Sequence, residues 1–203
     1  MKALILSSKI SIDKYQKINF HIDQDLCNFL TKLNFCVKPI AFKNNNIDFK
    51  NLEHSDGLIL AGGGDLYKYK KKKINKIRDN YEKKLFNYFF QKNKPILAIC
   101  RGFQLIADIK GIKLEKIKNH VNKFHLLKIN KSRFINNMRV TVNSFHNYSI
   151  KKLPKNFIKI SDTADGSIEI AEHKSKKILC LMFHPERRMK SSQNILSSIK
   201  NFF

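Results

Sequence analysis

Apolar and polar residues follow two different patterns along this chain, and the two patterns alternate. Short, nearly unbroken apolar runs occupy residues 2–8, 36–42, 56–64 and 95–100. Apolar residues recur at helical spacing in the stretches 23–35, 77–93 and 102–109. Runs of the first kind are typical of buried strands, and stretches of the second kind are typical of helices that bury one face. This alternation predicts a parallel sheet with helices on both of its faces.

The second half of the chain is richer in predicted strands. They lie at residues 124–129, 138–143, 157–163, 167–173 and 177–184, and a final helical pattern covers 192–203. The pair Asp165-Gly166 predicts a tight turn between two of these strands. We therefore expect one α/β domain over residues 1–203, with a mostly parallel central sheet, flanking helices and antiparallel strands at one edge.

Composition limits the class of protein. Apolar residues make up 42% of the 203 residues, which is typical of a folded chain with a buried core. The N-terminal apolar run is too short for a signal peptide, and no stretch approaches the ~18 apolar residues of a membrane span. We expect a soluble, cytoplasmic protein, and in that compartment its four cysteines should be reduced thiols. None of them forms a C-x-x-C pair, so we expect no zinc or thioredoxin-like site at the cysteines.

The chain carries a formal net charge of +24, from 40 Lys and Arg against 16 Asp and Glu. Such a charge is compatible with nucleic acid, a membrane surface or an anionic substrate as a partner. The lysines are scattered, however, and only Tyr67 and Tyr69 stand among them as a base-stacking platform would require. Lys, Asn, Ile and Phe, whose codons are rich in A and T, are all abundant, so we expect codon bias to account for the larger share of the lysines. We therefore expect no nucleic-acid partner and treat anion binding as a local question.

Cys100 stands where the predicted strand 95–100 passes directly into the predicted helix 102–109. In open α/β sheets the ligand cleft lies beyond the carboxyl ends of the strands. A thiol at such an end reaches the cleft, and the dipole of the following helix favours its thiolate form. Gly102 and the small Ala98 provide the space that a sharp nucleophile turn requires. Cys100 is therefore a candidate nucleophile.

Two further strand ends carry groups that a cysteine nucleophile needs. His184 ends the predicted strand 177–184, and Glu186 follows it by two residues. An imidazole can move the thiol proton, and a carboxylate can orient the ring and stabilise its charged form. At a third strand end, Gly62–Gly64 form a glycine run whose backbone N–H groups can face the cleft and hold an oxyanion.

Taken together, these stretches resemble the class I glutamine amidotransferase superfamily and, among its members, the free-standing gamma-glutamyl hydrolases. The resemblance covers nearly the whole chain and rests on "DGLILAGGGD", "PILAICRGFQLI", "VNSFHNYSI" and "FHPER", in the order usual for the family. Ala61 stands where proline is usual in the family, and Ala98 stands where glycine is usual. The resemblance implies a flavodoxin-like α/β fold.

The resemblance also implies roles for particular residues. Cys100, His184 and Glu186 would form a catalytic triad, and the backbone N–H groups of Gly63 and Arg101 would hold the oxyanion. The residues that would contact the glutamyl group of the substrate are Gly64, Gln104, Ser144, Phe145 and His146.

The implied reaction is hydrolysis of a gamma-glutamyl amide through a thioester on Cys100, with His184 protonating the departing nitrogen. This chemistry needs no metal ion and no organic cofactor. Asp79 and Glu82 also fit the family pattern, and we expect them to be structural. No synthase domain follows the predicted triad in this sequence, which favours a free-standing hydrolase. A glutaminase subunit that supplies ammonia to a separate synthase is an alternative.

A basic segment follows the glycine run and indicates the kind of leaving group. Its members are Lys68, Lys70, Lys71, Lys72, Lys73, Lys76 and Arg78. Because the segment precedes the next helix, we expect it to border the mouth of the cleft and to favour a phosphate-bearing leaving group. A solvated loop is the alternative for any single lysine. Hydrolysis of gamma-glutamyl aminobutyrate or of a gamma-glutamyl polyamine is the alternative for the reaction.

Overall fold

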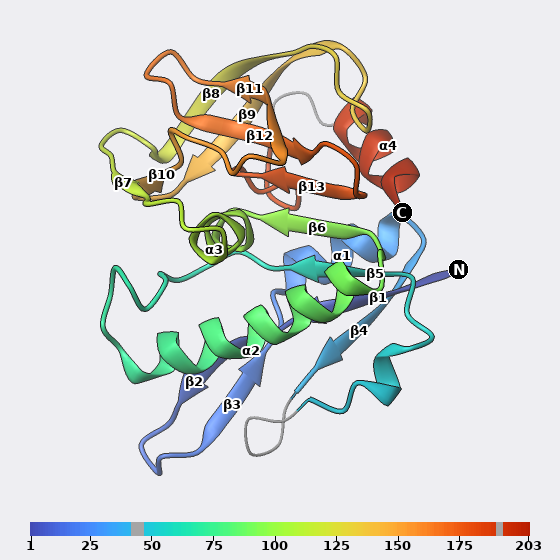
Figure 1. Ribbon diagram of the computed structural model, residues 1–203, viewed down its shortest axis with the longest axis vertical. Helices are drawn as coiled ribbons and strands as arrows, with labels where there is room; N and C mark the ends of the chain where they lie inside the picture. Colours follow the sequence, from blue (N-terminus) through green and yellow to red (C-terminus); the bar gives the residue numbers. More distant parts are fainter. Residues whose placement is uncertain (42–46, 190–192) are drawn as a thin grey trace.

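The computed structural model describes residues 1–41, 47–189 and 193–203. Its centre is a seven-stranded sheet with the strand order β11-β12-β13-β6-β5-β1-β4 (Figure 1). The parallel strands are β1 (Lys2–Ser7), β4 (Phe35–Ile40), β5 (Gly57–Leu60), β6 (Ile96–Ile99) and β13 (Ile178–Leu181). At one edge, β12 (Ile168–His173) and β11 (Phe157–Asp162) continue the sheet in antiparallel pairing. The predicted fold class and its antiparallel edge are confirmed.

The described part of the chain contains four α-helices, and they cover both faces of the sheet. They are α1 (Gln24–Lys32), α2 (Lys73–Gln91), α3 (Arg101–Ile109) and α4 (Gln193–Phe202), and a short 3-10 turn occupies Lys50–Leu52. Residues 42 and 192, at the ends of a predicted strand and a predicted helix, lie outside the described residues. None of the described helices combines the length and the apolar character that crossing a membrane requires.

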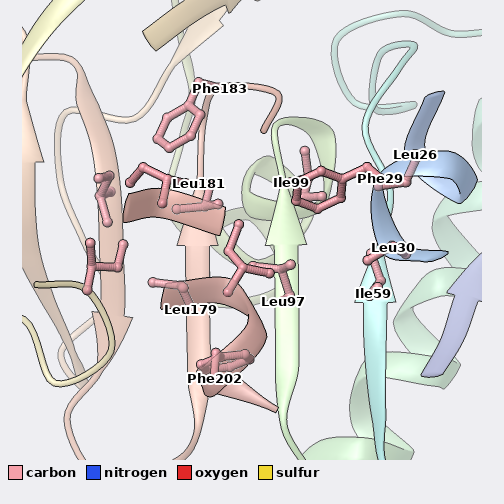
Figure 2. Close-up of a cluster of buried hydrophobic side chains, with 14 of the residues drawn as sticks. Leu26, Phe29, Leu30, Ile59, Leu97, Ile99, Leu179, Leu181, Phe183 and Phe202 are labelled. Carbon is pink, nitrogen blue, oxygen red and sulfur yellow. The ribbon is translucent and has the colours of Figure 1, made fainter. Parts of the chain in front are cut away.

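Each face of the sheet has its own hydrophobic cluster, because alternate residues of a strand point to opposite sides. The side chains of β6 and β13 that face α1 and α4 are Leu97, Ile99, Leu179 and Leu181 (Figure 2). Those in the cluster with α2 and α3 are Ile96, Ala98, Ile178 and Cys180. Fully burying one leucine or isoleucine stabilises the fold by roughly 1.5–3 kcal/mol. Burial on both faces is therefore why these strands read as unbroken apolar runs.

Three two-stranded antiparallel sheets flank the central sheet in the described part of the chain. They pair β2 (Lys9–Ile12) with β3 (Ile18–His21), β8 (Val121–Ile129) with β9 (Met138–Phe145), and β7 (Glu115–Lys116) with β10 (Tyr148–Ser149). The strands β8 and β9 contain two of the predicted strands but form a layer of their own (Figure 1). The short strands of the other two pairs bury too little apolar surface to leave a clear sequence pattern.

Candidate active site

Cys100 occupies a sharp turn between the end of β6 and the start of α3. Its backbone has φ 48° and ψ −99°, a conformation that costs a residue with a Cβ roughly 1–2 kcal/mol. The Cys100 N–H donates to the carbonyl of Leu181 at 2.7 Å, which joins the turn to β13. A Cβ at Gly102 would collide with the backbone carbonyl of Leu60. Glycine at 102 therefore lets α3 begin directly against β5 and holds the turn in place.

His184 links Cys100 to Glu186. Its Nδ1 lies 2.6 Å from a carboxylate oxygen of Glu186, and both side chains are 3% exposed. The other ring nitrogen, Nε2, is left for Cys100, which lines the same cavity as His184 and contributes to the raised pKa of that histidine. Burial lowers the pKa of His184, but Cys100 and Glu186 raise it by more, to about 9. The geometry therefore brings the three residues of the predicted triad together, in surroundings that favour a charged imidazole.

Asn143, which sequence reasoning missed, and Gly62 of the predicted glycine run hold this histidine in place. The side-chain amide of Asn143 accepts from the His184 N–H at 2.9 Å and donates to the His184 carbonyl at 2.8 Å. Gly62 lies against the ring, since a Cβ there would stand 2.5 Å from Cε1 of His184. Asn143 directly precedes the predicted substrate segment, but nothing in the sequence pattern indicates that its partner is the His184 backbone.

Arg78 binds backbone carbonyls in and next to the glycine run. Its guanidinium donates to the carbonyls of Ala61, Gly62 and Gly63, and it is buried. In a trans peptide the carbonyl and the following N–H point in opposite directions. Arg78 therefore turns the N–H groups of Gly63 and Gly64 away from itself. Both glycines have a positive φ and line the cavity beside Cys100, where such N–H groups can stabilise negative charge.

Two carboxylates of α2, those of Asp79 and Glu82, bind the side chains of Arg78 and Arg101. Glu82 receives hydrogen bonds from Arg78 and Arg101, and its side chain is completely buried. Asp79 receives a second bond from Arg101 at 2.5 Å and one from the Tyr67 N–H at 2.8 Å. Burial lowers the pKa of Arg78 to about 10, so the guanidinium stays charged at neutral pH. Asp79 and Glu82 thus hold Arg101, at the start of α3, and Glu82 also holds Arg78 of α2, in agreement with the predicted structural role.

A cavity of about 220 Å³ opens beside Cys100. Its walls are Gly63, Gly64, Asp65, Cys100, Gln104, Phe145, His146, Asn147, Tyr148, His184 and Arg187. A larger cavity, of about 460 Å³, lies on the far side of Glu186 and includes neither Cys100 nor His184 in its lining. The smaller cavity is the candidate substrate site, because it unites the thiol, the imidazole and the glycine run.

The structure brings most of the predicted substrate contacts to this cavity. Gly64, Gln104, Phe145 and His146 line it, whereas Ser144 is fully buried and donates its hydroxyl hydrogen to the His120 carbonyl at 2.6 Å. Gln104 donates its amide nitrogen to the Tyr148 carbonyl at 3.0 Å. The nitrogens of His146 face the Tyr148 carbonyl and the Glu169 carboxylate. Ser144 and His146 thus support the wall rather than offer free polar atoms to the cavity.

The basic segment lies beside the cavity and not in it. The lining includes no lysine of residues 68–73, although Lys70 pairs at 3.4 Å with Asp65, which does line it. Lys68 pairs with Asp108 at 3.3 Å, and Lys71 lies over the Tyr67 ring. The positive charge in the lining comes from Arg187, which sequence reasoning missed and whose guanidinium lies 4.7 Å from the centre of the Phe145 ring.

Comparisons with known proteins agree with this geometry. The Peptidase C26 family model matches residues 35–186. A gamma-glutamyl-CDP-amidate hydrolase of Campylobacter jejuni is 33% identical over 171 residues, which cover 84% of this chain and 80% of the relative. One subunit of the glutamine-hydrolysing GMP synthase of Thermoplasma acidophilum is 29% identical over 145 residues, which cover 70% of this chain and 68% of the relative.

Two solved structures share the fold. A Thermoplasma acidophilum protein, described provisionally as one subunit of a GMP synthase, has a TM-score of 0.74 at 22% identity, over 100% of this chain and 94% of that one. A glutamine amidotransferase of Thermotoga maritima has a TM-score of 0.68 at 18% identity, over 91% of this chain and 76% of that one. The chain therefore belongs to the Peptidase C26 family of class I glutamine amidotransferases. It is a glutamine amidotransferase-like hydrolase.

Proposed function

We propose that this chain hydrolyses a gamma-glutamyl amide through a thioester on Cys100. The observation that carries the proposal is the strained turn that holds Cys100 at φ 48° beside His184, whose Nδ1 is hydrogen-bonded to Glu186. Strain of this kind persists only where the surrounding structure enforces it, and such positions are concentrated at functional sites. A thiol paired with an oriented imidazole is the arrangement that nucleophilic catalysis by cysteine requires.

The reaction proceeds in two displacements. The thiolate of Cys100 attacks the gamma-carbonyl carbon, and the C–N bond breaks as the His184 imidazolium donates its proton to the leaving nitrogen. Water then attacks the thioester carbon while the neutral ring of His184 accepts a proton from it. The C–S bond breaks, free glutamate leaves, and the thiolate and the imidazolium are restored. Glu186 keeps the ring oriented and stabilises its charged form throughout.

Backbone donors hold the negative charge that develops on the carbonyl oxygen. The Arg101 N–H belongs to the first residue of α3 and so has no acceptor within the helix. The Gly63 N–H, turned away from Arg78, is the second donor, and Gly64 contacts the glutamyl group beside it. One donor of this kind contributes roughly 3 kcal/mol to the stability of the transition state.

The leaving group in this proposal carries phosphate. The Campylobacter jejuni relative is named for gamma-glutamyl-CDP-amidate, and this chain is 33% identical to it over most of both lengths. Hydrolysis of that compound gives glutamate and cytidine diphosphoramidate. Arg187 in the cavity wall supports an anionic leaving group, since a guanidinium forms paired hydrogen bonds with phosphate oxygens.

A comparison of amide substrates tests the reaction. Purified protein is incubated with glutamine, gamma-glutamyl aminobutyrate, a gamma-glutamyl polyamine and gamma-glutamyl-CDP-amidate, and released glutamate is measured. We expect the fastest release from gamma-glutamyl-CDP-amidate, and Cys100→Ala to fold normally and lose almost all turnover. Undiminished turnover by Cys100→Ala would exclude the thioester, and equally fast cleavage of the neutral amides would exclude the phosphate-bearing leaving group.

Substitutions at Arg187 and at its neighbour Arg188 provide a matched pair of variants that tests recognition of the leaving group. Arg188 is exposed and does not line the substrate cavity, so Arg188→Ala controls for the loss of one positive charge. We expect Arg187→Ala to lower kcat/KM for gamma-glutamyl-CDP-amidate roughly tenfold or more while leaving the slow hydrolysis of glutamine nearly unchanged. Equal losses on both substrates would place Arg187 outside leaving-group recognition.

A second function has its own support. Two relatives named as subunits of glutamine-hydrolysing GMP synthases match 70% and 78% of this chain, and in their case the name refers to glutamine hydrolysis within a synthase. A protein of that kind would turn over glutamine slowly alone and much faster with its synthase partner. Brisk hydrolysis of another gamma-glutamyl amide by the isolated chain would argue against this function.

A further inference from the structure

Behind one wall of the substrate cavity, three buried residues that commonly bind metals converge from three different elements. His120 directly precedes β8, His146 directly follows β9, and Glu169 lies in β12. One ligand atom from each lies within 4.8 Å of the others. None of the three belongs to the predicted triad. His146 lines the substrate cavity, but its ring nitrogens face the Tyr148 carbonyl and Glu169, so the proposed reaction does not account for the cluster.

The hydrogen bonds of His120 determine which of its nitrogens carries a proton. Its Nε2 lies 3.1 Å from a carboxylate oxygen of Asp165. That carboxylate also accepts hydrogen bonds from the Thr163 hydroxyl and from the Ser167 N–H, and therefore acts as an acceptor. His120 must donate from Nε2, and a neutral ring then has an unprotonated Nδ1. Among the described residues, this buried Nδ1 has no hydrogen-bond partner.

His146 is constrained in the same way. Its Nδ1 lies 3.0 Å from the Tyr148 carbonyl, and a carbonyl can only accept. Nδ1 must therefore carry the proton, which leaves Nε2 unprotonated in a neutral ring. This Nε2 lies 3.3 Å from Oε1 of Glu169, and the same oxygen lies 3.8 Å from Nδ1 of His120.

Three electron-pair donors thus face one another in a buried space. Oε2 of Glu169 also lacks a hydrogen-bond partner among the described residues. Buried acceptors that face one another with no donor between them are unfavourable, because they have lost water and repel one another. A positive charge at their centre removes that cost.

We propose that His120, His146 and Glu169 bind a divalent transition-metal ion, with zinc the best match. Neutral imidazole and carboxylate are ligands that zinc prefers, in tetrahedral geometry. At zinc–ligand distances near 2.1 Å, neighbouring ligand atoms stand about 3.4 Å apart. The two histidine nitrogens lie 3.3 and 3.8 Å from Oε1 of Glu169, and the three ligand atoms lie within 4.8 Å of one another, so they need to close slightly around the ion. Water, or His125 with its ring 4.4 Å from that of His120, can complete the coordination.

The surrounding contacts match those around known metal-binding histidines. Such histidines usually donate their other ring nitrogen to a carboxylate or a backbone carbonyl, which sets the tautomer. Here His120 has the carboxylate of Asp165 and His146 has the carbonyl of Tyr148. The Tyr148 carbonyl also accepts from Gln104, which lines the substrate cavity. The ion would therefore be structural. It would fix the position of the cavity wall and take no part in the reaction.

Zinc binding by the whole chain tests the proposal. Cys100→Ala serves as the parent protein, so that the active-site thiol cannot bind the metal. Zinc is titrated into the metal-free parent by competition with a chromophoric chelator, and the melting temperature is measured with and without zinc. We expect one tightly bound ion per chain and a higher melting temperature with zinc.

Matched variants in that parent separate this site from adventitious binding. We expect Glu169→Gln and His120→Asn each to lose tight binding. Asp165→Asn, which alters the carboxylate partner of His120 without removing a ligand, should bind roughly tenfold to a hundredfold more weakly. His54→Ala, at an exposed histidine, should bind like the parent. Circular dichroism checks that each variant is folded. Two ligand variants are used so that the test still holds if one of them does not fold.

Cobalt substitution identifies the ligands. A site of imidazole and carboxylate should show only the visible bands of tetrahedral cobalt, whereas binding at Cys27 or Cys36 would add a thiolate charge-transfer band. The proposal is overturned if the parent binds no stoichiometric zinc, if the band of a thiolate ligand appears, or if Glu169→Gln and His120→Asn bind zinc as tightly as the parent. In those cases protons, rather than a metal ion, neutralise the buried cluster.

Discussion

At the residue scale, Cys100 adopts a backbone conformation that is unfavourable for any residue with a Cβ, and its neighbours hold it there. The turn is held by a hydrogen bond from the Cys100 N–H to Leu181 on β13 and by the contact of Gly102 with Leu60 on β5. The same turn directs the thiol toward His184. The strain at one residue is thus offset by contacts with two neighbouring strands of the sheet.

The raised pKa of His184 makes a prediction at the same scale. Its value of about 9 exceeds the ordinary 6.5, so the charged ring is favoured in the folded protein. The resulting stabilisation is complete below about pH 6.5 and is lost as the pH rises through about 9. Cys100→Ala removes one of the two side chains that raise this pKa. We expect the NMR titration of the His184 ring to shift to lower pH in Cys100→Ala.

Glu186→Gln is the second variant. It removes the negative charge of the carboxylate that faces Nδ1 of His184 and keeps the shape of residue 186. It should also lower the pKa of His184. A titration midpoint that stays near pH 9 in both variants would show that neither neighbour sets the protonation of the ring. In the wild-type protein, turnover should decline above about pH 9, as the proton donor to the leaving nitrogen is lost.

At the element scale, the glycine run after β5 depends on α2. Arg78 of α2 binds the carbonyls of Ala61, just before the run, and of Gly62 and Gly63 within it. Glu82, one helical turn later, binds Arg78 and also Arg101 at the start of α3. One carboxylate therefore connects both proposed sources of oxyanion donors. The conformation of the glycine run is a property of the contact between the loop and the helix, and not of the glycines alone.

Replacing Glu82 with Gln should destabilise the protein more than its small change in shape suggests. The variant leaves two buried guanidinium groups with less compensating charge, and breaking a buried ion pair in this way typically costs about 3–5 kcal/mol. Urea denaturation monitored by circular dichroism measures the change in free energy of unfolding. The folded fraction should also lose turnover, because Arg78 and Arg101 are no longer held together.

The exposed pair of Lys159 and Asp162 on β11 supplies the control for this change. Asp162→Asn removes one carboxylate from a solvated ion pair and should change the free energy of unfolding by no more than about 0.5 kcal/mol. A Glu82→Gln protein as stable as Asp162→Asn would show that the buried network does not hold the fold.

At the scale of the whole molecule, the net charge of +24 destabilises the folded state. Forty basic residues face sixteen acidic ones, so most surface lysines have no carboxylate to pair with. Bringing like charges together on folding is unfavourable, and salt screens that repulsion. The same charge favours weak, salt-sensitive association with polyanions, which is separate from recognition of a substrate at Arg187.

Stability should therefore rise as chloride is added at neutral pH. The screening length falls from roughly 30 Å at 0.01 M salt to about 8 Å at 0.15 M. We expect a gain of ~1 kcal/mol in the free energy of unfolding, which corresponds to an increase of roughly 2–4 °C in the melting temperature of a chain of this size. Calorimetry in sodium chloride measures it, and sucrose at equal osmolarity is the uncharged control. A melting temperature that falls with chloride would contradict repulsion as the dominant charge effect.

Much of this molecule could be predicted from local patterns. The strands β1, β5, β6 and β13 are buried on both faces, so each has a continuous apolar run with a clear end. Cys100 and His184 follow such ends, and parallel strands place their carboxyl ends at one edge of a sheet. The pairing of β13 with β6 then brings the two residues together. Their catalytic roles stay predictions until turnover is measured.

Other features depend on contacts between distant segments, which leave no periodic signal. The side chain of Asn143 could have pointed to substrate, but it binds the backbone of His184. The lysines of residues 68–73 follow the glycine run in sequence, yet the cavity wall receives its positive charge from Arg187. The cluster of His120, His146 and Glu169 requires three elements to meet, and the spacing of the residues along the chain does not show it.

The sequence by itself therefore determined the order of the central strands and the four α-helices, the two-sided burial of the central sheet, and the strand ends that carry Cys100 and His184. These follow from hydrophobic burial and backbone geometry, which act over a few residues. Only the tertiary structure decided which charged and polar groups pair, how Arg78 orients the glycine run, and which side chains form the cavity. Hydrogen bonds and ion pairs form over a few ångströms in space, and residues far apart in the chain reach that distance only after the sheet and its helices have packed.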